Sequence, residues 1–308
     1  MSRFFSAASA PGYLQNELFY ERKPVTDLWK KLTAVAKAQW KWRATTNVFM
    51  NSKKRVLQVH GPPGAGKSSA TFSWVYNVVA NANLDVNALW INCATTRQES
   101  ICWSITREEQ ATAVQVSEMT TFPSIAAETA ASFHIIVFDG VRKATLEDWR
   151  GFFNNLARRG VFVIVVSSEG VRMHQGDAND ILNLNHIVSS WTMDEYLAAC
   201  NSDQFWSNCR KFLERATDND SYERRKDLLE EKFYVAGQSA RYMFGLGSDD
   251  VKLRIAEDAR SMGGIGALED AARSDRSSGA VNSLIARTRE GSNGILQAIA
   301  PLFRLWQN

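Results

Sequence analysis

One short string, GPPGAGKS at positions 61–68, constrains the fold of this chain more than any other feature. It fits the pattern G-x-x-x-x-G-K-[ST], in which a glycine-rich backbone surrounds phosphate groups. The residues before it, Arg55–His60 (RVLQVH), are typical of a short β-strand, and Ser68–Ala82 after it carries apolar residues at helical spacing. A strand, a glycine-rich loop and a helix in this order predict a phosphate-binding loop.

Each residue type in this loop is expected to have a separate role in nucleotide binding. Gly64 and Gly66 let the backbone turn and bring its amide groups onto the β-phosphate, where a Cβ would collide. The Lys67 ammonium serves the β- and γ-phosphates, and the Ser68 hydroxyl is a ligand for Mg²⁺, so ATP and Mg²⁺ are the expected cofactors. Ser69 is expected on the α-phosphate side. The expected nucleotide-binding residues are Gly61, Pro62, Pro63, Gly64, Ala65, Gly66, Lys67, Ser68 and Ser69.

Strands and helices alternate after the loop, which predicts an α/β fold: a three-layer P-loop NTPase with a parallel sheet, followed by an α-helical lid subdomain. A helix before the fourth strand is expected to be capped by Thr145, since Asp148 follows three positions later. The expected strands are, in chain order, Arg55–His60, Ala88–Asn92, Phe133–Asp139, Val161–Ser167 and a short fifth, His186–Ser190.

Asp139 ends the third of these strands, where a carboxylate must emerge to hold the magnesium shell at the carboxyl edge of a parallel sheet. A helix cap or a turn residue is the alternative for such an acid. The next residue is Gly140, where many ATPases carry a glutamate that polarises the attacking water, and this departure weakens the case for hydrolysis. Polar residues at other strand ends are candidates for sensing the γ-phosphate or for plain loop capping: Asn92, Ser167, Ser168 and Glu169.

Helices alone follow Trp191, beginning with a capping box formed by Thr192 and Glu195. The expected domains are a basic helical segment (1–50), the P-loop NTPase core (51–191), a helical lid (192–262) and a helical tail (263–308). The expected lid helices after the capping box are Asp203–Ala216, Ser221–Tyr234, Ser239–Phe244 and Asp249–Met262.

Several strings together resemble one family: FYERKPVTDLWKKL, GPPGAGKSS, IIVFDG, WTMDEYLAAC and EEKFYVAGQSARYMFG. They are similar to the P-loop NTPase region of the Crinkler effectors of oomycetes and of the related retrotransposon hot spot proteins of trypanosomes, over about Phe19–Met262. The resemblance implies an ATPase of the STAND or AAA-like group, in a protein that is delivered to host cells and acts in the host nucleus. It also implies that Arg241 is a lid arginine that reaches the γ-phosphate, against the alternative of a surface ion pair.

Two departures from that family concern the ends of the chain. Its members usually carry an N-terminal translocation header and often a C-terminal nuclease-like domain, for which 60 residues before the loop and about 45 after the lid leave no room. We therefore expect a fragment, a shortened paralogue or a free-standing regulatory ATPase. Met1–Tyr13 lacks the features of a signal peptide and no apolar run is long enough to cross a membrane, so the chain as written is expected inside the cell.

Composition excludes other classes of protein. With 45% apolar and 22% charged residues the chain resembles ordinary globular proteins, not disordered or disulfide-rich ones. The cysteines, at positions 93, 102, 200 and 209, include no C-x-x-C pair and have no histidine at metal-ligand spacing, so we expect buried, reduced thiols.

The net charge is only 36 − 33 = +3, but residues 1–60 carry eleven basic and three acidic residues, or +8. Apolar residues at helical spacing over Thr26–Trp42 predict an amphipathic helix whose lysines lie mostly off the apolar stripe. A solvated helix face is the simpler interpretation; weak, nonspecific DNA binding is the other. The residues considered for that surface are Lys30, Lys31, Lys37, Lys41, Arg43, Lys53, Lys54 and Arg55, beside Trp40 and Trp42.

Three functions remain open at this stage. The first is slow, Mg²⁺-dependent ATP hydrolysis that drives a conformational change between core and lid, with Lys67, Asp139 and Arg241 as its catalytic residues. The second is a nucleotide-gated interaction module that binds ATP and barely hydrolyses it. The third is a small-molecule kinase using Arg158 and Arg159. No N-K-x-D string occurs, which favours adenine over guanine; the protein partner and the oligomeric state, homo-oligomers included, stay open.

Overall fold

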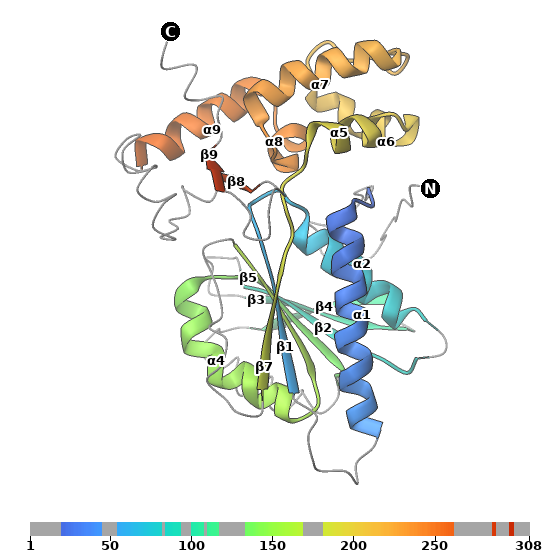
Figure 1. Cartoon of the computed structure of the whole chain (residues 1–308), viewed down its shortest axis with the longest axis vertical. Coiled ribbons are helices and arrows are strands. Elements are labelled where there is room, and N and C mark those ends of the chain that lie inside the picture. Colours follow the sequence, from blue (N-terminus) through green and yellow to red (C-terminus); the bar gives the residue numbers. More distant parts are fainter. Residues whose placement is uncertain are drawn as a thin grey trace. The chain divides into compact units, whose positions relative to one another are not determined.

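A computed structural model of the chain (Figure 1) describes residues 20–44, 54–81, 84–93, 100–107, 110–116, 133–168, 181–261, 285–287 and 296–298. The chain divides into two compact units. The first comprises residues 1–60 and 67–187, and the second comprises residues 61–66 and 188–308. The phosphate loop expected at 61–68 therefore begins in the second unit and ends in the first.

A seven-stranded sheet forms the centre of the first unit, in the order β4-β3-β2-β5-β6-β1-β7. The five strands from β2 to β7 in this order are parallel, whereas β3 pairs antiparallel with both β2 and β4. This confirms an α/β fold with a mostly parallel sheet. The strands are β1 (Lys54–His60), β2 (Ala88–Asn92), β3 (Ser100–Thr106), β4 (Gln110–Val116), β5 (Ile135–Val141), β6 (Phe162–Ser167) and β7 (Ile181–Ile187).

Two features of the sheet correct the sequence-based prediction. The antiparallel pair β3–β4 was not expected, because its Ser, Thr and Gln residues lack the continuous apolar run that marked the other strands. The fifth parallel strand begins at Ile181 rather than His186 and ends at Ile187. It pairs along its whole length with β1 at the edge of the sheet, where alternating Asn and apolar residues are tolerated.

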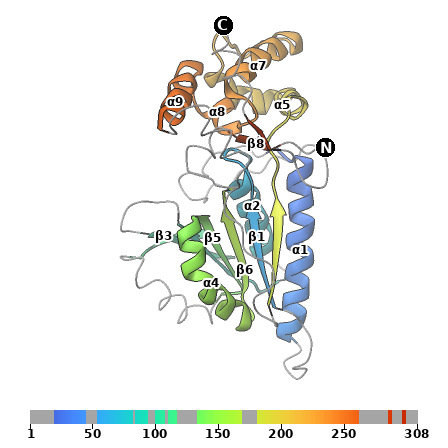
Figure 2. The ribbon, with the colours of Figure 1, turned by 60° about the vertical axis from the view of Figure 1, so that its left-hand side comes forward.

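Helices cover both faces of the sheet and give three layers (Figure 2). On one side lie α1 (Lys23–Ala44) and α2 (Lys67–Val79), and on the other lies α4 (Lys143–Arg158). Two tryptophans join the first pair of helices: the Trp29 indole donates to the carbonyl of Ala70 at 2.8 Å, and the Trp74 indole donates to the Thr33 hydroxyl at 3.0 Å. The helix that follows the glycine-rich loop is thus bonded to the N-terminal helix.

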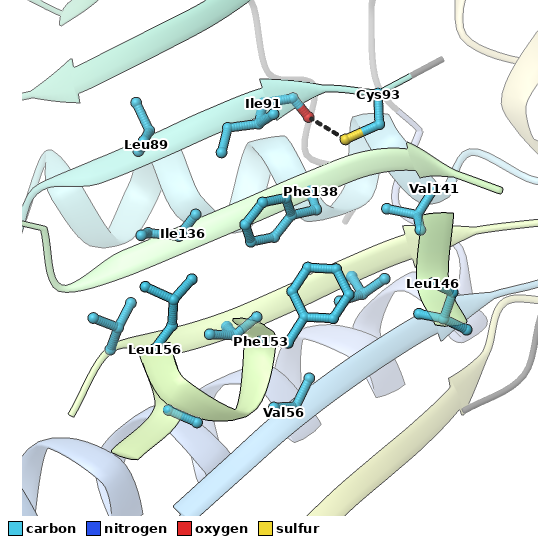
Figure 3. Close-up of a cluster of buried hydrophobic side chains, with 14 of the residues drawn as sticks. Val56, Leu89, Ile91, Cys93, Ile136, Phe138, Val141, Leu146, Phe153 and Leu156 are labelled. Carbon is cyan, nitrogen blue, oxygen red and sulfur yellow. Dashed lines mark hydrogen bonds between the residues drawn. The ribbon is translucent and has the colours of Figure 1, made fainter. Parts of the chain in front are cut away.

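The core under α4 is made of strand residues that are buried by aromatic side chains of that helix (Figure 3). Phe138 of β5 lies against Phe153, with ring centroids 4.8 Å apart, and both are fully buried. The helix itself begins at Lys143 after Arg142, which makes no side-chain cap bond, so the expected cap at Thr145 is wrong. The Leu146 amide donates to the carbonyl of Arg142, so the helix begins three residues earlier than expected.

Between residues 193 and 261, the elements of the second unit are helices. The expected capping box is present, because the Glu195 amide donates to the Thr192 hydroxyl and the Thr192 amide donates to the Glu195 carboxylate. Next to it, the rings of Trp191 and Tyr196 stack with their centroids 5.0 Å apart. The elements are α5 (Met193–Cys200), α6 (Asp203–Cys209), the 3₁₀ helix η2 (Arg210–Phe212), α7 (Tyr222–Ala236), α8 (Ala240–Gly245) and α9 (Ser248–Ser261).

The described residues of the tail form strands. β8 (Ile285–Arg287) pairs antiparallel with β9 (Leu296–Ala298), so the expectation of a helical tail is wrong for these residues. Among the helices in the described part of the chain, none is both long and apolar enough to cross a bilayer.

Candidate phosphate-binding site

The two residues expected to organise magnesium lie in contact within the first unit. Ser68 is in the first turn of α2, and Asp139 lies near the carboxyl end of β5, 71 positions later in the chain. The Ser68 hydroxyl donates a hydrogen bond of 2.8 Å to Oδ1 of Asp139. Lys67 precedes Ser68 as the first residue of the helix, directly after the glycines of the loop. The fold therefore has the strand, loop and helix of a P-loop NTPase, with an acid from a second strand beside the serine.

Asp139 lies beside the end of the neighbouring strand β2. Asn92, the last residue of β2, pairs with Asp139 in the parallel register, and the Cys93 amide donates to the Asp139 carbonyl at 2.7 Å. Asp139 is 5% exposed, so its carboxylate lies in a largely desolvated position that favours charge-assisted bonds. Asn92 therefore lies at the same sheet edge as the candidate magnesium ligand.

Gly140 adopts a conformation that explains its presence after Asp139. Its φ is +79°, in the left-handed region, and the pairing between β5 and β6 shifts register between Asp139 and Val141. The chain forms a bulge here, which glycine permits and a residue with a Cβ would strain. A glutamate at this position would thus meet a backbone that disfavours it.

Ser167 at the end of β6 is held by a residue that the sequence analysis passed over. The side-chain amide of Gln58 in β1 donates to the Ser167 hydroxyl at 2.7 Å, and both side chains are buried. Gln58 is the one uncharged polar residue among the apolar positions of RVLQVH before its final histidine, and that break in the pattern was the available signal. Ser168 follows the strand and is half-buried, and Glu169 lies outside the described residues.

The glycine-rich part of the loop belongs to the second unit. Gly61, Gly64 and Gly66 have φ values of +150°, +75° and +83°, and the Ala65 amide donates to the Pro62 carbonyl at 3.3 Å. Such a run of left-handed glycines is what allows successive backbone amides to face one anion. The positive φ values account for glycine at Gly64 and Gly66, and their contact with a phosphate stays a prediction.

Arg241 is the second residue of α8, in the same unit as these glycines. Its side chain is exposed, and its backbone nitrogen is 3.1 Å from the position that a Cβ on Gly64 would take. Within the described ranges, no carboxylate forms an ion pair with its guanidinium. Arg241 is thus adjacent to the loop through its main chain.

The four cysteines are free and buried, as expected. Burial raises the pKa of Cys93, with a further contribution from the charge of Asp139, and burial also raises the pKa of Cys102 to about 12. In the second unit, the Sγ atoms of Cys200 and Cys209 are 3.7 Å apart. Burial raises the pKa of Cys200 as well, so the thiols of Cys93, Cys102 and Cys200 stay protonated at neutral pH, which disfavours a nucleophilic role for them.

Three of the basic residues considered for the N-terminal surface have described side chains: Lys30, Lys31 and Lys37. Lys30 and Lys37 are exposed on α1, whereas the Lys31 ammonium donates to the Asn185 carbonyl at 2.6 Å, and burial lowers its pKa. The apolar stripe of the helix is buried, including Leu28 and Leu32. The side chains of Trp40, Lys41, Trp42, Arg43, Lys54 and Arg55 lie outside the described part, as does Lys53.

Arg158 and Arg159, considered for a kinase, lie at the end of α4, just before β6 begins at Phe162. Asp139 lies near the opposite end of β5, which runs parallel to β6. The two arginines therefore lie at the opposite ends of the strands from Asp139 and from Ser68, which bonds to it. This removes the geometric basis for a kinase role of these two residues.

Comparisons with known proteins find only a distant structural similarity. No family model matches it, and no curated protein matches it. A match among solved structures is the structure of C. elegans PCH-2, with 12% sequence identity and a TM-score of 0.40. The match covers 79% of this chain and 63% of that chain, so the chain spans less than two thirds of that structure.

Proposed function

We propose that this protein binds ATP through residues 61–69 and hydrolyses it slowly with Mg²⁺, in a cycle that couples the α/β core to the helical lid. The observation that carries the proposal is the 2.8 Å hydrogen bond between Ser68 and Asp139. The sequence marks these residues independently, one by a loop motif and the other by a strand end. Their contact is what a shared role at one magnesium ion requires.

The donor set fits magnesium. A hydroxyl and a carboxylate are oxygen ligands, and magnesium in nucleotide sites uses one or two protein ligands together with phosphate oxygens and waters. When bound, Mg²⁺ would neutralise charge on the β- and γ-phosphates. Ser68 and Asp139 would hold it, and Lys67 would bind the phosphates.

Binding is tested by thermal unfolding with and without ATP and MgCl₂. At a ligand concentration of 100 times Kd, wild type should gain about 2.7 kcal/mol. Lys67→Ala should lose most of this gain, because the ammonium that pairs with the phosphates is removed. Lys37→Ala, which removes an exposed lysine from α1, is the matched control and should keep the gain in full. The proposal is contradicted if ATP stabilises all three proteins equally, or if it does not stabilise wild type.

Gly140 favours a second candidate, the nucleotide-gated module that barely hydrolyses ATP. The glycine bulge replaces the position from which a glutamate would polarise water. A single-turnover experiment separates the two functions. Cleavage of bound ATP well above its spontaneous rate, abolished in Asp139→Asn, supports the ATPase; tight binding without cleavage supports the module.

Two finer points belong to the same proposal. Arg241 is proposed to contact the γ-phosphate from the lid, in which case Arg241→Ala should impair ATP hydrolysis more than ADP binding. The context of a Crinkler-type effector acting in the host nucleus is supported by the quoted strings, which include the whole of α8 and the loop itself. Expression of a tagged chain in a plant cell tests it: nuclear accumulation supports the effector context, and exclusion from the nucleus contradicts it.

A further inference from the structure

The start of α8 packs directly on the phosphate loop, within the second unit. The Ala240 amide donates a hydrogen bond of 3.3 Å to the Gly64 carbonyl. A Cβ built on Gly64 would lie 2.3 Å from the Ser239 hydroxyl oxygen and 3.2 Å from the Ala240 nitrogen. Real Cβ atoms do not approach other atoms to 2.3 Å, so Ser239 occupies the space that a side chain at Gly64 would need.

A second contact joins the loop to the same structure. A Cβ on Gly61 would lie 2.2 Å from the Val188 carbonyl oxygen, so the loop also lies against the segment that follows residue 187. That segment is tied to the residue before Ser239, since the Trp191 amide donates to the Gln238 carbonyl at 3.1 Å. The two supports of the loop are therefore connected to each other.

Ser239 precedes a helix but does not cap it with its side chain. Serine before a helix normally caps it with its side chain, as Ser202 and Ser221 do for α6 and α7. Ser239 precedes α8 in extended backbone and makes no side-chain cap bond. The residue is nevertheless only 8% exposed, and its hydroxyl oxygen lies where a Cβ on Gly64 would be. Capping does not account for this serine, whereas packing on the loop does.

We propose that Ser239 is a positioning residue for the phosphate loop: its side chain holds Gly64 in the left-handed conformation in which the loop binds phosphate. This rests on the nucleotide-binding function proposed above. A phosphate that binds the loop amides would approach Gly64 from the face that Ser239 leaves open. Nucleotide affinity therefore depends on a lid residue that touches the loop and not the phosphates.

The proposal predicts how two substitutions differ from a cap substitution in the same unit. Ser239→Ala removes the oxygen over Gly64, and Ser239→Val replaces it with two methyl groups in a space that is already full. We expect each to weaken ADP binding roughly threefold to thirtyfold, as contacting residues typically do, with valine the stronger. Ser221→Ala, which removes a real cap, should lower the melting temperature and leave the Kd for ADP unchanged.

The experiment is calorimetric titration of the full chain with Mg·ADP, beside melting temperatures without nucleotide. A higher Kd for Ser239→Ala with an unchanged melting temperature supports positioning, because a purely structural role would move the melting temperature instead. A double-mutant cycle sharpens this. Gly64→Ala should cost less affinity in Ser239→Ala than in wild type, because the 2.3 Å clash has been removed.

The outcomes distinguish a failure of the positioning role from a failure of the proposed nucleotide binding. If wild type does not bind ADP, both are overturned. If wild type binds ADP while both Ser239 variants bind it equally well and the cycle is additive, only the positioning role is overturned. Hydrogen exchange gives an independent measure: the Ala240 amide should become more protected on ADP binding in wild type and less so in Ser239→Val.

Discussion

The two units are held together in different ways. In the first, strands β5 and β6 are buried on both faces and the core is apolar, with Phe138 at its centre. In the second, buried charged side chains bind main-chain groups between short helices. The Arg225 guanidinium donates to the carbonyls of Cys200 and Asp220, and the Lys232 ammonium donates to that of Leu246 at 2.7 Å.

This difference has a physical cause. A sheet satisfies its main-chain groups by pairing strands, so its side chains are free to be apolar. Helices of six to fifteen residues expose many unpaired carbonyls at their ends, and a long cationic side chain can reach several of them. The second unit also has buried aromatic residues, such as Tyr196 and Trp206. The first unit should therefore respond mainly to changes in packing, and the second to changes in charge as well as in packing.

The largest expected effect is in the core of the first unit. Phe138→Ala removes a fully buried ring that packs on Phe153 and should cost about 3–5 kcal/mol of unfolding free energy, measured by denaturant titration. Ile187→Ala, at a residue 41% exposed, is the control and should cost far less. Similar losses in both variants would contradict a core held by buried packing.

A smaller effect is expected at the buried lysine of the second unit. Lys232→Met keeps most of the volume but leaves the Leu246 carbonyl without its donor, which should cost about 1–3 kcal/mol. Lys252→Met removes an exposed lysine that pairs with Asp249, and there no measurable change is expected. Equal tolerance of both substitutions would show that the charge of Lys232 does not stabilise this unit.

The second unit should also depend on pH through Glu214. Burial alone would raise the pKa of this carboxyl, but hydrogen bonds from the amide and hydroxyl of Ser248 outweigh it and lower the pKa below 4.5. A lowered pKa means that the contribution is complete above pH 4.5 and is lost as the pH falls through the folded-state pKa. Unfolding measured from pH 6 to pH 3 should show a smaller loss in Glu214→Gln. Identical pH profiles would refute this.

The smallest effect concerns exposed charge on the first unit. We expect weak DNA binding that depends on salt, with a slope of roughly −0.9 per phosphate contact on duplex DNA. The Lys30→Glu, Lys37→Glu double variant should lose it at low salt without losing stability, because both lysines are exposed on α1. Fluorescence anisotropy with a labelled duplex measures it. Binding that survives this reversal, or no binding by wild type at low salt, leaves α1 as a structural helix only.

Local sequence determined much of this protein. The composition and spacing of residues 61–68 predicted the loop, and the apolar runs predicted the strands on which Asp139 and Ser167 lie. The capping box at Thr192 was also readable, because both partners lie within four residues. These features share one property: the interactions that produce them act between residues close in the chain.

Tertiary structure decided the rest. The bond from Gln58 to Ser167 spans 109 positions, and the contact of Ser239 with Gly64 spans 175, so no local pattern encodes either. The antiparallel pair β3–β4 at the sheet edge likewise depends on the docking of β3 on β2, which its own mixed composition does not reveal. The sequence therefore determined which residues are candidates for the chemistry, and the packing of distant segments decided which residues lie against them.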